Sequence, residues 1–414
     1  MTKIDELIQE LCPDGVETFP LEECCNILDK KRKPVTKNSR EKGEYPYYGA
    51  NGVQDYVSDY IFNGKFVLVG EDGSVITKSG TPVVTWAEGK IWVNNHAHVI
   101  EEKSGTMLRY LYFYIQTIDV TSLIHGNIPK LTGRDFRSLK IALPPLEIQR
   151  EIVSILDNFT NLTAELTAEL TARKTQYGYY RDKLLEVETD IHKYTLGEIA
   201  TVTKLAGFEF TNYVTYSERG NIIALRGLNV KNGKLDLSDV KYIDKSDFSK
   251  LERSKLHIGD MLFTYVGTVG QVAIVDEEDK YYLAPNVALI RFDKKILLPQ
   301  YMKYYFQTTQ FWDKQIRRLL QSSSMQNIPM EKIRKFEIIV PPFDVQNRIV
   351  NVLDNFEKIC SDLNIGLPAE IEARQKQYEY YRDKLLTFAE TGNTILSRAE
   401  QSRAEQSRAE QSTN

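Results

Sequence analysis

The sequence contains a long internal duplication. The segment LPPLEIQREIVSILDNF ends at Phe159, and a matching segment, VPPFDVQNRIVNVLDNF, ends 197 positions later at Phe356. A second pair lies downstream, where QYGYYRDKLL from Gln176 returns as QYEYYRDKLL from Gln377, 201 positions later. A repeat of this length constrains the architecture more than any short motif, because both copies are expected to form the same structural unit.

Both copies predict a helix with a narrow apolar stripe. Spacings of four, three, four and three residues between apolar positions are those of a coiled-coil seam. The first copy shows them at Ile148, Ile152, Ile155, Phe159 and Leu162. The second copy repeats them at Val345, Ile349, Val352, Phe356 and Ile359. A Pro-Pro pair precedes each copy, where the fixed φ of proline suits a helix start.

The two copies differ in the middle of the expected helix. The first continues through two TAEL tetrads, at 163–166 and 167–170, so a helix over 147–188 would be about 42 residues or roughly 60 Å long. The second carries Gly366-Leu-Pro368, which predicts the end of one helix and the start of another. Matching seams pair most simply in antiparallel fashion, although the periodicity equally allows ordinary packing helices of two duplicated domains.

The segments before the two helices share a pattern of short strands broken by glycines. Gly70-Glu-Asp-Gly73 matches Gly267-Thr-Val-Gly270 at the same separation of 197 residues, and Asn127-Ile-Pro129 matches Asn327-Ile-Pro329. Little else in these segments agrees. One framework therefore carries two different surfaces.

We expect a mixed α/β protein in which two globular α/β domains alternate with two long helices. The helices are expected to pair as an antiparallel coiled coil, which relates the two domains by an approximate two-fold axis. The expected segments are 1–143 for the first domain, 144–188 for the first helix, 189–340 for the second domain, 341–390 for the second helix, and 391–414 for a tail of SRAEQ repeats. The tail has no apolar seam and is expected to be disordered.

Composition excludes several classes of protein. The chain is 42% hydrophobic and 27% charged, which is typical of a soluble globular protein. No stretch approaches the ~18 apolar residues of a membrane span, and the N-terminus lacks a secretion signal, so we expect a cytoplasmic protein that makes no membrane contact. The four cysteines show no metal-ligand spacing. A net charge of −4 argues against a uniformly basic surface but allows local basic patches.

No catalytic motif can be assembled from the sequence. A phosphate-binding GxxxxGK[ST] loop is missing. Pro341-Pro342-Phe343 is similar to the catalytic tetrapeptide of amino-methyltransferases, but Val340 replaces the polar residue that would hold the target amine. His96 and His98 would share one face of a strand, yet no Cys or third His lies nearby to complete a metal site. We expect a non-catalytic chain without a metal, and a structural or base-contacting role for these histidines.

The duplicated helices, the TAEL tetrads and the paired YYRDKLL segments, at 179–185 and 380–386, resemble the specificity subunit of type I restriction-modification enzymes. The resemblance covers residues 1 to about 390 and leaves the SRAEQ tail outside. It implies two target recognition domains, each of which binds one half of a split double-stranded DNA site. Because the halves differ in sequence, the site should be asymmetric and bipartite.

The resemblance also implies partner subunits. The two helices would form the spacer and the docking site for two modification subunits, which carry S-adenosylmethionine and methylate adenine. Two restriction subunits would add DNA cleavage that uses ATP and magnesium, so no cofactor is expected in this chain. The number of TAEL tetrads would set the gap between the half-sites.

Candidate contact residues follow from chemistry, because Lys and Arg bind phosphates and short polar side chains on loops bind base edges. The DNA-contact candidates are Lys31, Arg32, Lys33, Ser74, Lys78, His96 and His125 in the first half and Arg226, Tyr265, Thr268, Ser322, Ser323, Ser324 and Gln326 in the second. The candidates for the spacer and partner docking are Leu162, Leu166, Leu170, Tyr180, Arg181, Tyr381 and Arg382.

Two other functions stay open at this point. The chain could be a stand-alone DNA adenine methyltransferase with permuted motifs, in which case it would bind S-adenosylmethionine without partners. It could also be a coiled-coil scaffold that does not bind DNA, in which case no sequence-selective DNA binding would appear even with partner subunits present.

Overall fold

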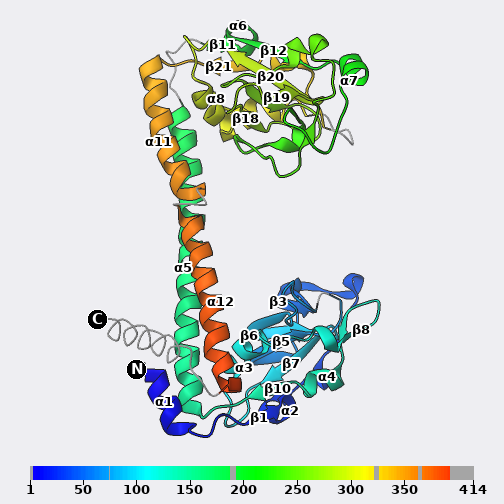
Figure 1. Cartoon of the computed structure of the whole chain (residues 1–414), viewed down its shortest axis with the longest axis vertical. Helices are drawn as coiled ribbons and strands as arrows, with labels where there is room; N and C mark the ends of the chain where they lie inside the picture. Colours follow the sequence, from blue (N-terminus) through cyan, green and yellow to red (C-terminus); the bar gives the residue numbers. More distant parts are fainter. Residues whose placement is uncertain (1–2, 74, 187–192, 321–325, 362–365, 392–414) are drawn as a thin grey trace, which may run out of the picture. The chain divides into compact units, whose positions relative to one another are not determined.

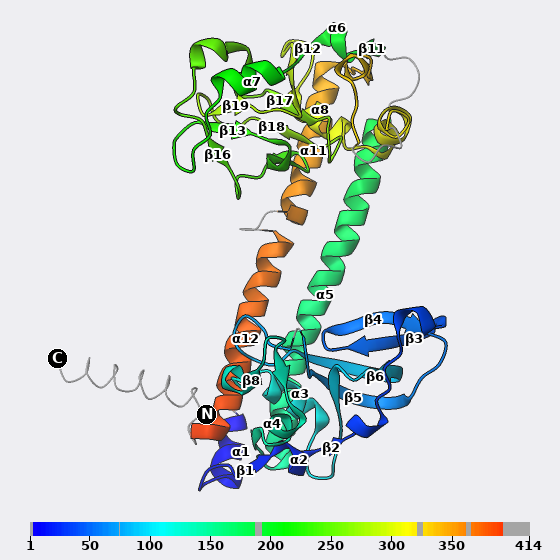
Figure 2. The ribbon, with the colours of Figure 1, turned by 90° about the vertical axis from the view of Figure 1, so that its right-hand side faces the viewer.

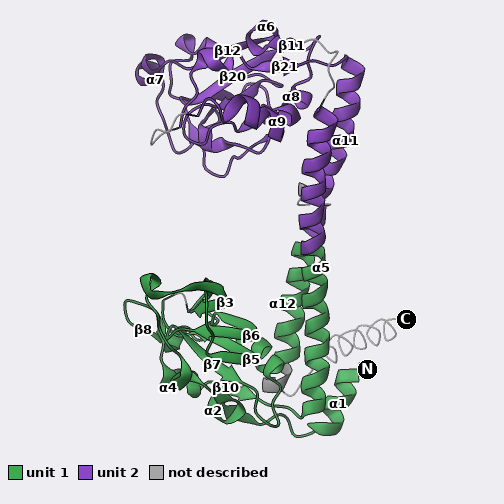
Figure 3. Cartoon of the chain, turned by 180° about the vertical axis from the view of Figure 1, so that it is seen from behind, with its two compact units in different colours: residues 1–166, 371–414 green, residues 167–370 purple. Residues whose placement is uncertain are grey.

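The computed structural model describes residues 3–73, 75–186, 193–320, 326–361 and 366–391. The chain divides into two compact units (Figure 3): unit 1 comprises residues 1–166 and 371–414, and unit 2 comprises residues 167–370. Helix α5 (Leu146–Leu185) is 40 residues long and contributes residues to both units. The segment boundaries expected from the sequence remain a prediction.

Unit 1 is built on a six-stranded sheet with the strand order β2-β7-β5-β6-β3-β4 (Figure 1). All neighbours in it are antiparallel except β3 and β6. The sheet strands are β2 (Asn26–Ile27), β3 (Lys42–Gly49), β4 (Gly52–Val57), β5 (Phe62–Gly70), β6 (Val84–Val93) and β7 (Ala97–Glu101). The other elements are α1 (Lys3–Leu11), β1 (Thr18–Pro20), α2 (Leu21–Cys24), α3 (Leu108–Ile115), β8 (Ile124–His125), β9 (Lys130–Leu131), α4 (Gly133–Arg137), β10 (Lys140–Ala142) and α12 (Leu367–Thr391).

The main core of unit 1 joins the sheet to the helices (Figure 2). It contains Val67 and Val69 from β5, Ile148 and Ile152 from α5, and Leu385 from α12. Helix α12 lies beside the first half of α5 and runs in the opposite direction, because its C-terminal end packs near the start of α5. Of the seam predicted from the first copy, Ile148 and Ile152 are buried in this core, whereas Ile155 and Phe159 are half-buried and Leu162 is exposed. The predicted seam is therefore buried at its start and not along its whole length.

Unit 2 has a four-stranded sheet, β12-β20-β17-β18, and a three-stranded sheet, β16-β13-β19. The sheet strands are β12 (Ala200–Lys204), β13 (Ile223–Leu225), β16 (Lys241–Tyr242), β17 (Met261–Thr264), β18 (Val272–Ile274), β19 (Tyr281–Leu283) and β20 (Val287–Phe292). The other elements include β11 (Lys193–Thr195), α6 (Leu196–Ile199), α7 (Gly207–Tyr213), β14 (Val230–Lys231), β15 (Lys234–Leu235), α8 (Pro299–Tyr305), α9 (Thr309–Phe311), α10 (Met330–Ile333), β21 (Glu337–Ile339) and α11 (Phe343–Ser361).

The two units reuse the same helix contact. In unit 1, Phe159 of α5 stacks on Tyr381 of α12 at a ring-centroid distance of 5.3 Å. In unit 2, the partners are exchanged, and Phe356 of α11 stacks on Tyr180 of α5 at 5.9 Å. Helix α11 ends at Ser361 and α12 begins at Leu367, which confirms the interruption predicted from the Gly-Leu-Pro sequence. No described helix is both long and apolar enough to cross a membrane.

A buried glutamine fixes the start of each duplicated helix. The side chain of Gln149 accepts a hydrogen bond from the Met107 N–H (2.8 Å) and donates to the carbonyl oxygens of Pro144 (2.7 Å) and Gly105 (3.2 Å). Gln346 does the same in unit 2, with the Leu298 N–H (2.9 Å) and the carbonyl oxygens of Pro341 (2.8 Å) and Ile296 (3.0 Å). Both side chains are fully buried. Each glutamine therefore ties the Pro-Pro turn to the loop before α3 or α8.

A buried tyrosine makes a second shared contact. The hydroxyl of Tyr110 on α3 donates to the carbonyl oxygen of Ala142 at the end of β10 (2.7 Å). The hydroxyl of Tyr301 on α8 donates in the same way to Ile339 at the end of β21 (3.2 Å). In each unit the strand before the Pro-Pro turn is thus held to the same helix that the glutamine reaches.

Unit 1 has a charged cluster without a counterpart in the shared framework. Asp29 accepts hydrogen bonds from the Val99 N–H (2.9 Å) and lies 2.7 Å from Nδ1 of buried His98. The guanidinium of Arg32 donates to Glu71 (2.6 Å). Burial raises the pKa of Asp29, but the hydrogen bonds from His98 and Val99 and the charge of Arg32 outweigh it, so the pKa lies below its ordinary value. The ionised carboxylate therefore holds the segment 29–33 against the sheet.

We expect Gln149→Leu to lower the free energy of unfolding of unit 1 by about 2–4 kcal/mol, because it removes the hydrogen-bond partner of the Met107 N–H and of the carbonyl oxygens of Pro144 and Gly105. Urea unfolding followed by tryptophan fluorescence measures this. Trp86 and Trp92 report on unit 1 once Trp312, the third tryptophan, is replaced by Phe. The matched control is Gln375→Leu, an exposed position on α12. Equal losses for the two variants would contradict the proposed role of the buried amide.

We expect the stability difference between the unchanged protein and Asp29→Asn to depend on pH. A carboxylate with a lowered pKa contributes stability above its ordinary pKa of about 3.9, and the contribution is lost as the pH falls below that value. The difference in unfolding free energy should be largest near neutral pH and shrink from about pH 4 downwards. Asp59→Asn, at an exposed position, serves as the control, and a pH-independent difference for Asp29→Asn would refute the prediction.

Candidate nucleic-acid interface

Three loops of unit 1 meet beyond the ends of β5 and β7. The Glu71 N–H donates to the carbonyl oxygen of His96 (2.8 Å), which joins the loop after β5 to the loop before β7. The Gly73 N–H donates to Pro129 (2.9 Å), and the Leu131 N–H donates to Glu71 (2.9 Å), which adds the loop before β9. We call residues 71–73, 94–97 and 126–130 loop cluster 1.

Unit 2 builds the same arrangement with the same backbone hydrogen bonds. The Tyr265 N–H donates to Asn286 (3.3 Å), the Gly267 N–H donates to Gln326 (2.9 Å), and the Ile328 N–H donates to Tyr265 (2.9 Å). Residues 265–269, 284–287 and 326–328 are called loop cluster 2. Gly73 and Gly267 occupy equivalent positions and both have a positive φ, 83° and 80°, which favours glycine.

The hydrogen bonds correct two matches made from the sequence. Gly73 corresponds to Gly267, so the glycine turns are 194 residues apart in structure and the match of Gly70 with Gly267 is wrong. Asp72 bridges to Lys130 where Val266 bridges to Asn327. The match of Asn127-Ile-Pro129 with Asn327-Ile-Pro329 is therefore shifted by three residues, because short identical motifs can recur by chance where side chains are free to vary.

Loop cluster 1 carries charged side chains. His96 is 47% exposed, and its Nδ1 contacts the carboxylate of Asp72, so Nε2 is the ring nitrogen left for an external partner. Lys130 pairs with Glu71 at 3.3 Å. Lys31 and Lys33 are exposed on the neighbouring segment 29–33. The structure thus places His96, Lys31, Lys33 and Lys130 on one part of unit 1.

A cleft lies next to Lys33. It has a volume of about 480 Å³ and is lined by residues 33–36, 39–41 and 57–59 and by Trp92. The indole Nε1 of Trp92 donates to the carbonyl oxygen of Lys33 (2.7 Å), and the Lys33 ammonium lies 6.0 Å from the ring centroid. Arg40 stacks on the ring of Tyr47 at 4.1 Å. The lining of this cleft thus includes two basic side chains, Lys33 and Arg40, that each lie over an aromatic ring.

Arg32 is half-buried and hydrogen-bonded, whereas its neighbours Lys31 and Lys33 are exposed. Its guanidinium donates to Glu71, to the carbonyl oxygen of Ala97 (2.7 Å) and to that of Asn95 (3.4 Å). Among the described residues, Asp29, Glu71 and His98 are the groups close enough together to bind a metal ion, within 4.8 Å of one another. Arg32 already balances the two carboxylates, and Nε2 of His98 faces the carbonyl oxygen of Leu131 (3.1 Å). The geometry gives this cluster a structural role.

Loop cluster 2 carries neutral polar side chains. Thr268, Gln326 and Asn327 are exposed. Tyr265 is half-buried, and its ring lies 5.8 Å from the Lys204 ammonium. Burial raises the pKa of the Tyr265 phenol, which therefore stays protonated and can donate a hydrogen bond. The two clusters share a backbone arrangement and differ in chemistry.

The remaining DNA-contact candidates lie in several places. Arg226 follows β13, and its guanidinium donates to the carbonyl and carboxylate oxygens of Asp239, both at 2.9 Å. Lys78 is exposed on the turn that follows loop cluster 1. Ser74, Ser322, Ser323 and Ser324 lie outside the described residues, as does the side chain of His125.

The candidates for the spacer and partner docking lie on the helices. Leu162 is exposed, whereas Leu166 and Leu170 are half-buried. Arg181 pairs with Asp182, and Arg382 pairs with Asp383, each next to an inward tyrosine of the same helix. Sequence reasoning missed Tyr179 and Tyr380, which are 60% and 53% exposed. Adjacent residues point to different faces of a helix, so the Tyr-Tyr pairs carried this signal.

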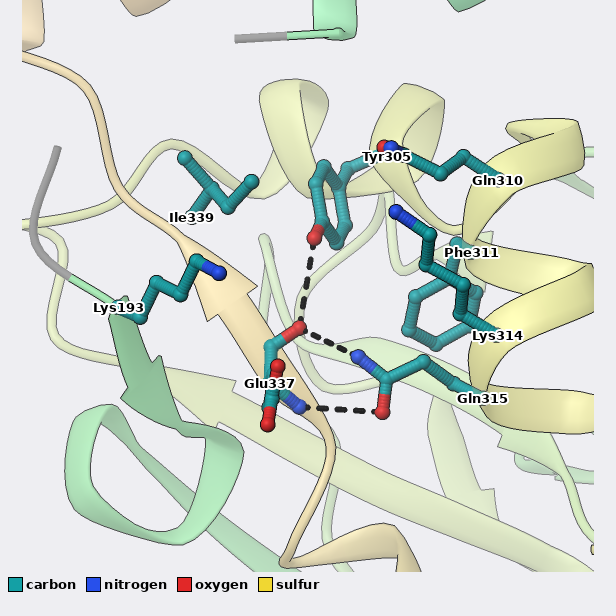
Figure 4. A pocket seen from close by; sticks show the side chains of 8 residues that line it. All are labelled: Lys193, Tyr305, Gln310, Phe311, Lys314, Gln315, Glu337 and Ile339. Atoms are coloured by element: carbon teal, nitrogen blue, oxygen red, sulfur yellow. Dashed lines mark hydrogen bonds between the residues drawn. The ribbon is translucent and has the colours of Figure 1, made fainter. Parts of the chain in front are cut away.

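A separate pocket opens in unit 2 beside β21 (Figure 4). It has a volume of about 220 Å³ and contains none of the DNA-contact candidates: its lining is Lys193, Tyr305, Gln310, Phe311, Lys314, Gln315, Glu337 and Ile339. The hydroxyl of Tyr305 and the amide of Gln315 both donate to the carbonyl oxygen of Glu337, at 3.3 and 2.8 Å. Its polar groups are thus partly engaged with the backbone.

Known proteins share both the sequence and the fold. Residues 13–173 and 188–373 match the family described as type I restriction modification DNA specificity domain. A Haemophilus influenzae protein named as a type I restriction enzyme specificity subunit is 36% identical over 385 residues, which cover 90% of this chain and 96% of that protein. The specificity subunit of EcoR124I/EcoR124II from Escherichia coli is 34% identical over 302 residues, 69% of this chain and 72% of that protein.

Solved structures agree in fold at low sequence identity. The S subunit of a type I restriction-modification system from M. genitalium has a TM-score of 0.52 and 13% identity, and it covers 90% of this chain and 97% of its own. A chain from a study of complex assembly in the type I system has a TM-score of 0.57 and 15% identity, with 91% and 98% covered. The mixed fold predicted from the sequence is thus confirmed.

The family match also decides between two of the candidate functions. The matched domain is a DNA specificity domain, and the relatives are specificity subunits and not the catalytic subunits of their systems. The hypothesis of a stand-alone methyltransferase is therefore wrong. The chain belongs to the family of type I restriction-modification specificity subunits, as a non-catalytic member of it.

Proposed function

We propose that the chain recognises an asymmetric, bipartite DNA site, with loop cluster 1 bound to one half-site and loop cluster 2 to the other. The observation that carries this proposal is the reuse of one backbone arrangement with different exposed side chains. A duplicated fold with identical loops would favour a palindromic site, as in dimeric repressors. Loops that differ, as Asp72 and His96 differ from Val266 and Asn286, favour two unlike half-sites.

The contacts divide by chemistry. Exposed Lys31, Lys33 and Lys78 suit phosphate groups, which position a protein on the duplex. His96, Thr268 and Gln326 suit base edges in the major groove, where hydrogen-bond donors and acceptors distinguish the four base pairs. A net charge of −4 is compatible with this, because the lysines gather next to the loops.

The helices supply the surface for partner subunits in this proposal. Tyr179, Tyr380 and Leu162 are large apolar side chains that stay exposed, and exposed aromatic residues are enriched at protein interfaces. Two modification subunits would bring S-adenosylmethionine and two restriction subunits would bring ATP and magnesium. The chain itself then needs no cofactor, because it supplies recognition and the partners supply chemistry.

We expect His96→Ala to lower the preference for the cognate duplex over a scrambled duplex by roughly 5- to 100-fold, the range for one lost base contact. The assay is fluorescence anisotropy with the full chain in complex with its modification subunits, on a site first identified by mapping methylation in the host. His257→Ala is a close control, because His257 is 44% exposed and its Nδ1 also contacts a carboxylate, that of Glu278, outside both clusters.

The controls separate the possible outcomes. Equal effects of His96→Ala and His257→Ala would mean that loop cluster 1 does not recognise DNA. A complex of the unchanged chain that binds cognate and scrambled duplexes equally would refute DNA recognition and favour a scaffold.

We expect a third TAEL tetrad, inserted after residue 170, to widen the gap between the half-sites and to leave both half-sites unchanged. Four helical residues add about 6 Å, against ~3.4 Å for one base step. Methylation mapping in cells measures the gap. Glu165→Gln, which changes a tetrad without changing its length, should keep the original gap, and an unaltered gap after the insertion would contradict the spacer role.

A further inference from the structure

Asn286 occupies the position in loop cluster 2 that His96 occupies in loop cluster 1. The backbone shows this twice. Gly70 pairs with Ala97 across β5 and β7, as Thr264 pairs with Val287 across β17 and β20. The carbonyl oxygen of the preceding residue, His96 or Asn286, accepts a hydrogen bond from the first residue of the neighbouring loop. A base-contact candidate in one cluster therefore has a defined partner position in the other.

The side chain of Asn286 has no hydrogen-bond partner among the described residues of its unit. It is exposed, and the described residues form no hydrogen bond with its amide, whereas Nδ1 of His96 is held by Asp72. The residue equivalent to Asp72 is Val266, which has no polar side chain. Both the amide oxygen and the amide nitrogen of Asn286 are thus left for an external group.

The backbone at this position restricts the choice of residue. Asn286 has φ 72°, a left-handed conformation that Gly and Asn adopt readily and that most other residues avoid. Glycine would satisfy the backbone without offering any side chain. Asparagine offers a carboxamide, with a donor and an acceptor side by side, at the exposed end of the loop.

A carboxamide complements one base edge in particular. In the major groove, adenine presents N7 as an acceptor and the N6 amino group as a donor, and Asn or Gln can bond to both. The neighbouring exposed residues of loop cluster 2, Thr268, Gln326 and Asn327, are also neutral donors and acceptors. Lysines and carboxylates, which would favour guanine or cytosine, are found in loop cluster 1 instead.

We propose that Asn286 is a specificity-determining residue of unit 2 and that it recognises an adenine through N6 and N7 in the half-site bound by loop cluster 2. This rests on the DNA recognition proposed above. The sequence match places Asn286 opposite His96, but Asn286 is not among the DNA-contact candidates chosen from the sequence, which does not reveal its left-handed backbone.

The test is selection of binding sites from a pool of DNA with both half-sites randomised, with the full chain in complex with its modification subunits. Asn286→Gly removes the amide and keeps the backbone conformation. It should weaken the preference for adenine at one position of one half-site by roughly 5- to 100-fold and leave the other half-site unchanged. Asn286→Asp keeps the shape but only accepts hydrogen bonds, so the preference at that position should move towards cytosine, whose N4 group donates.

Two controls make the result specific. Asp279→Gly removes an exposed side chain of the same shape, also at a positive φ of 55°, from the turn at the other end of β19, and it should change neither half-site. His96→Gly should change only the other half-site. Unaltered sites for both Asn286 variants would overturn the proposal while leaving DNA recognition intact. An unchanged chain that selects no sequence at all would overturn DNA recognition and this proposal together.

Discussion

The buried glutamine at the start of each duplicated helix is the contact on which the rest of each unit depends. A helix start leaves backbone groups unsatisfied, and here the first proline of each Pro-Pro pair is also buried. One side chain, that of Gln149 or Gln346, donates to the carbonyl oxygen of this first proline and accepts from a backbone N–H more than 40 residues away in sequence. The position of the globular part on its helix is therefore specified inside each unit by hydrogen bonds that only an amide in this place can make.

Because this framework is held by backbone hydrogen bonds and the buried core, the exposed side chains of the loops are not needed to stabilise the fold. The three loops of each cluster are joined by backbone hydrogen bonds, which are the same whatever side chains the loops carry. The cores below them need only apolar residues of suitable volume, such as Leu131 in unit 1 and Ile328 in unit 2, both fully buried. An exposed position such as His96 or Thr268 can then change at little cost to folding, whereas Asn286 is limited to residues that accept a left-handed backbone.

The sequence predicted the long helices, their interruption and the duplication because these depend on periodicity and on Pro and Gly, which are visible in one dimension. It did not predict the register of the loops. Gly73 and Gly267 are equivalent because of their positive φ and their hydrogen bonds, whereas the matches by spacing relied on short identical letters. Arg32 was chosen for its charge, and its engagement by Glu71 could not be foreseen, because Glu71 lies on a different loop.

The junction between globular part and helix shows that the framework itself is not copied side chain by side chain. In unit 1, Arg109 pairs with Asp157 at 2.7 Å and lies over the rings of Trp86, Tyr112 and Phe113. In unit 2, Lys303 is buried and pairs with Glu357 at 2.7 Å, and Tyr304 donates to the same carboxylate. Each unit pairs a cation with a carboxylate on the helix, because an unpaired charge at this half-buried or buried junction would be costly.

The exposed surfaces of the long helices, unlike the loops, are nearly the same in the two copies. The segment QYxYYRDKLL is nearly identical in its two copies, and in each copy one tyrosine of the Tyr-Tyr pair packs on a phenylalanine while the other stays exposed. A surface that is nearly identical in both copies of the duplication suits two copies of one partner. Loop clusters that differ between the copies suit two different stretches of DNA. The pattern of what the duplication preserved and what it changed is thus itself an argument for one kind of docked subunit and two kinds of half-site.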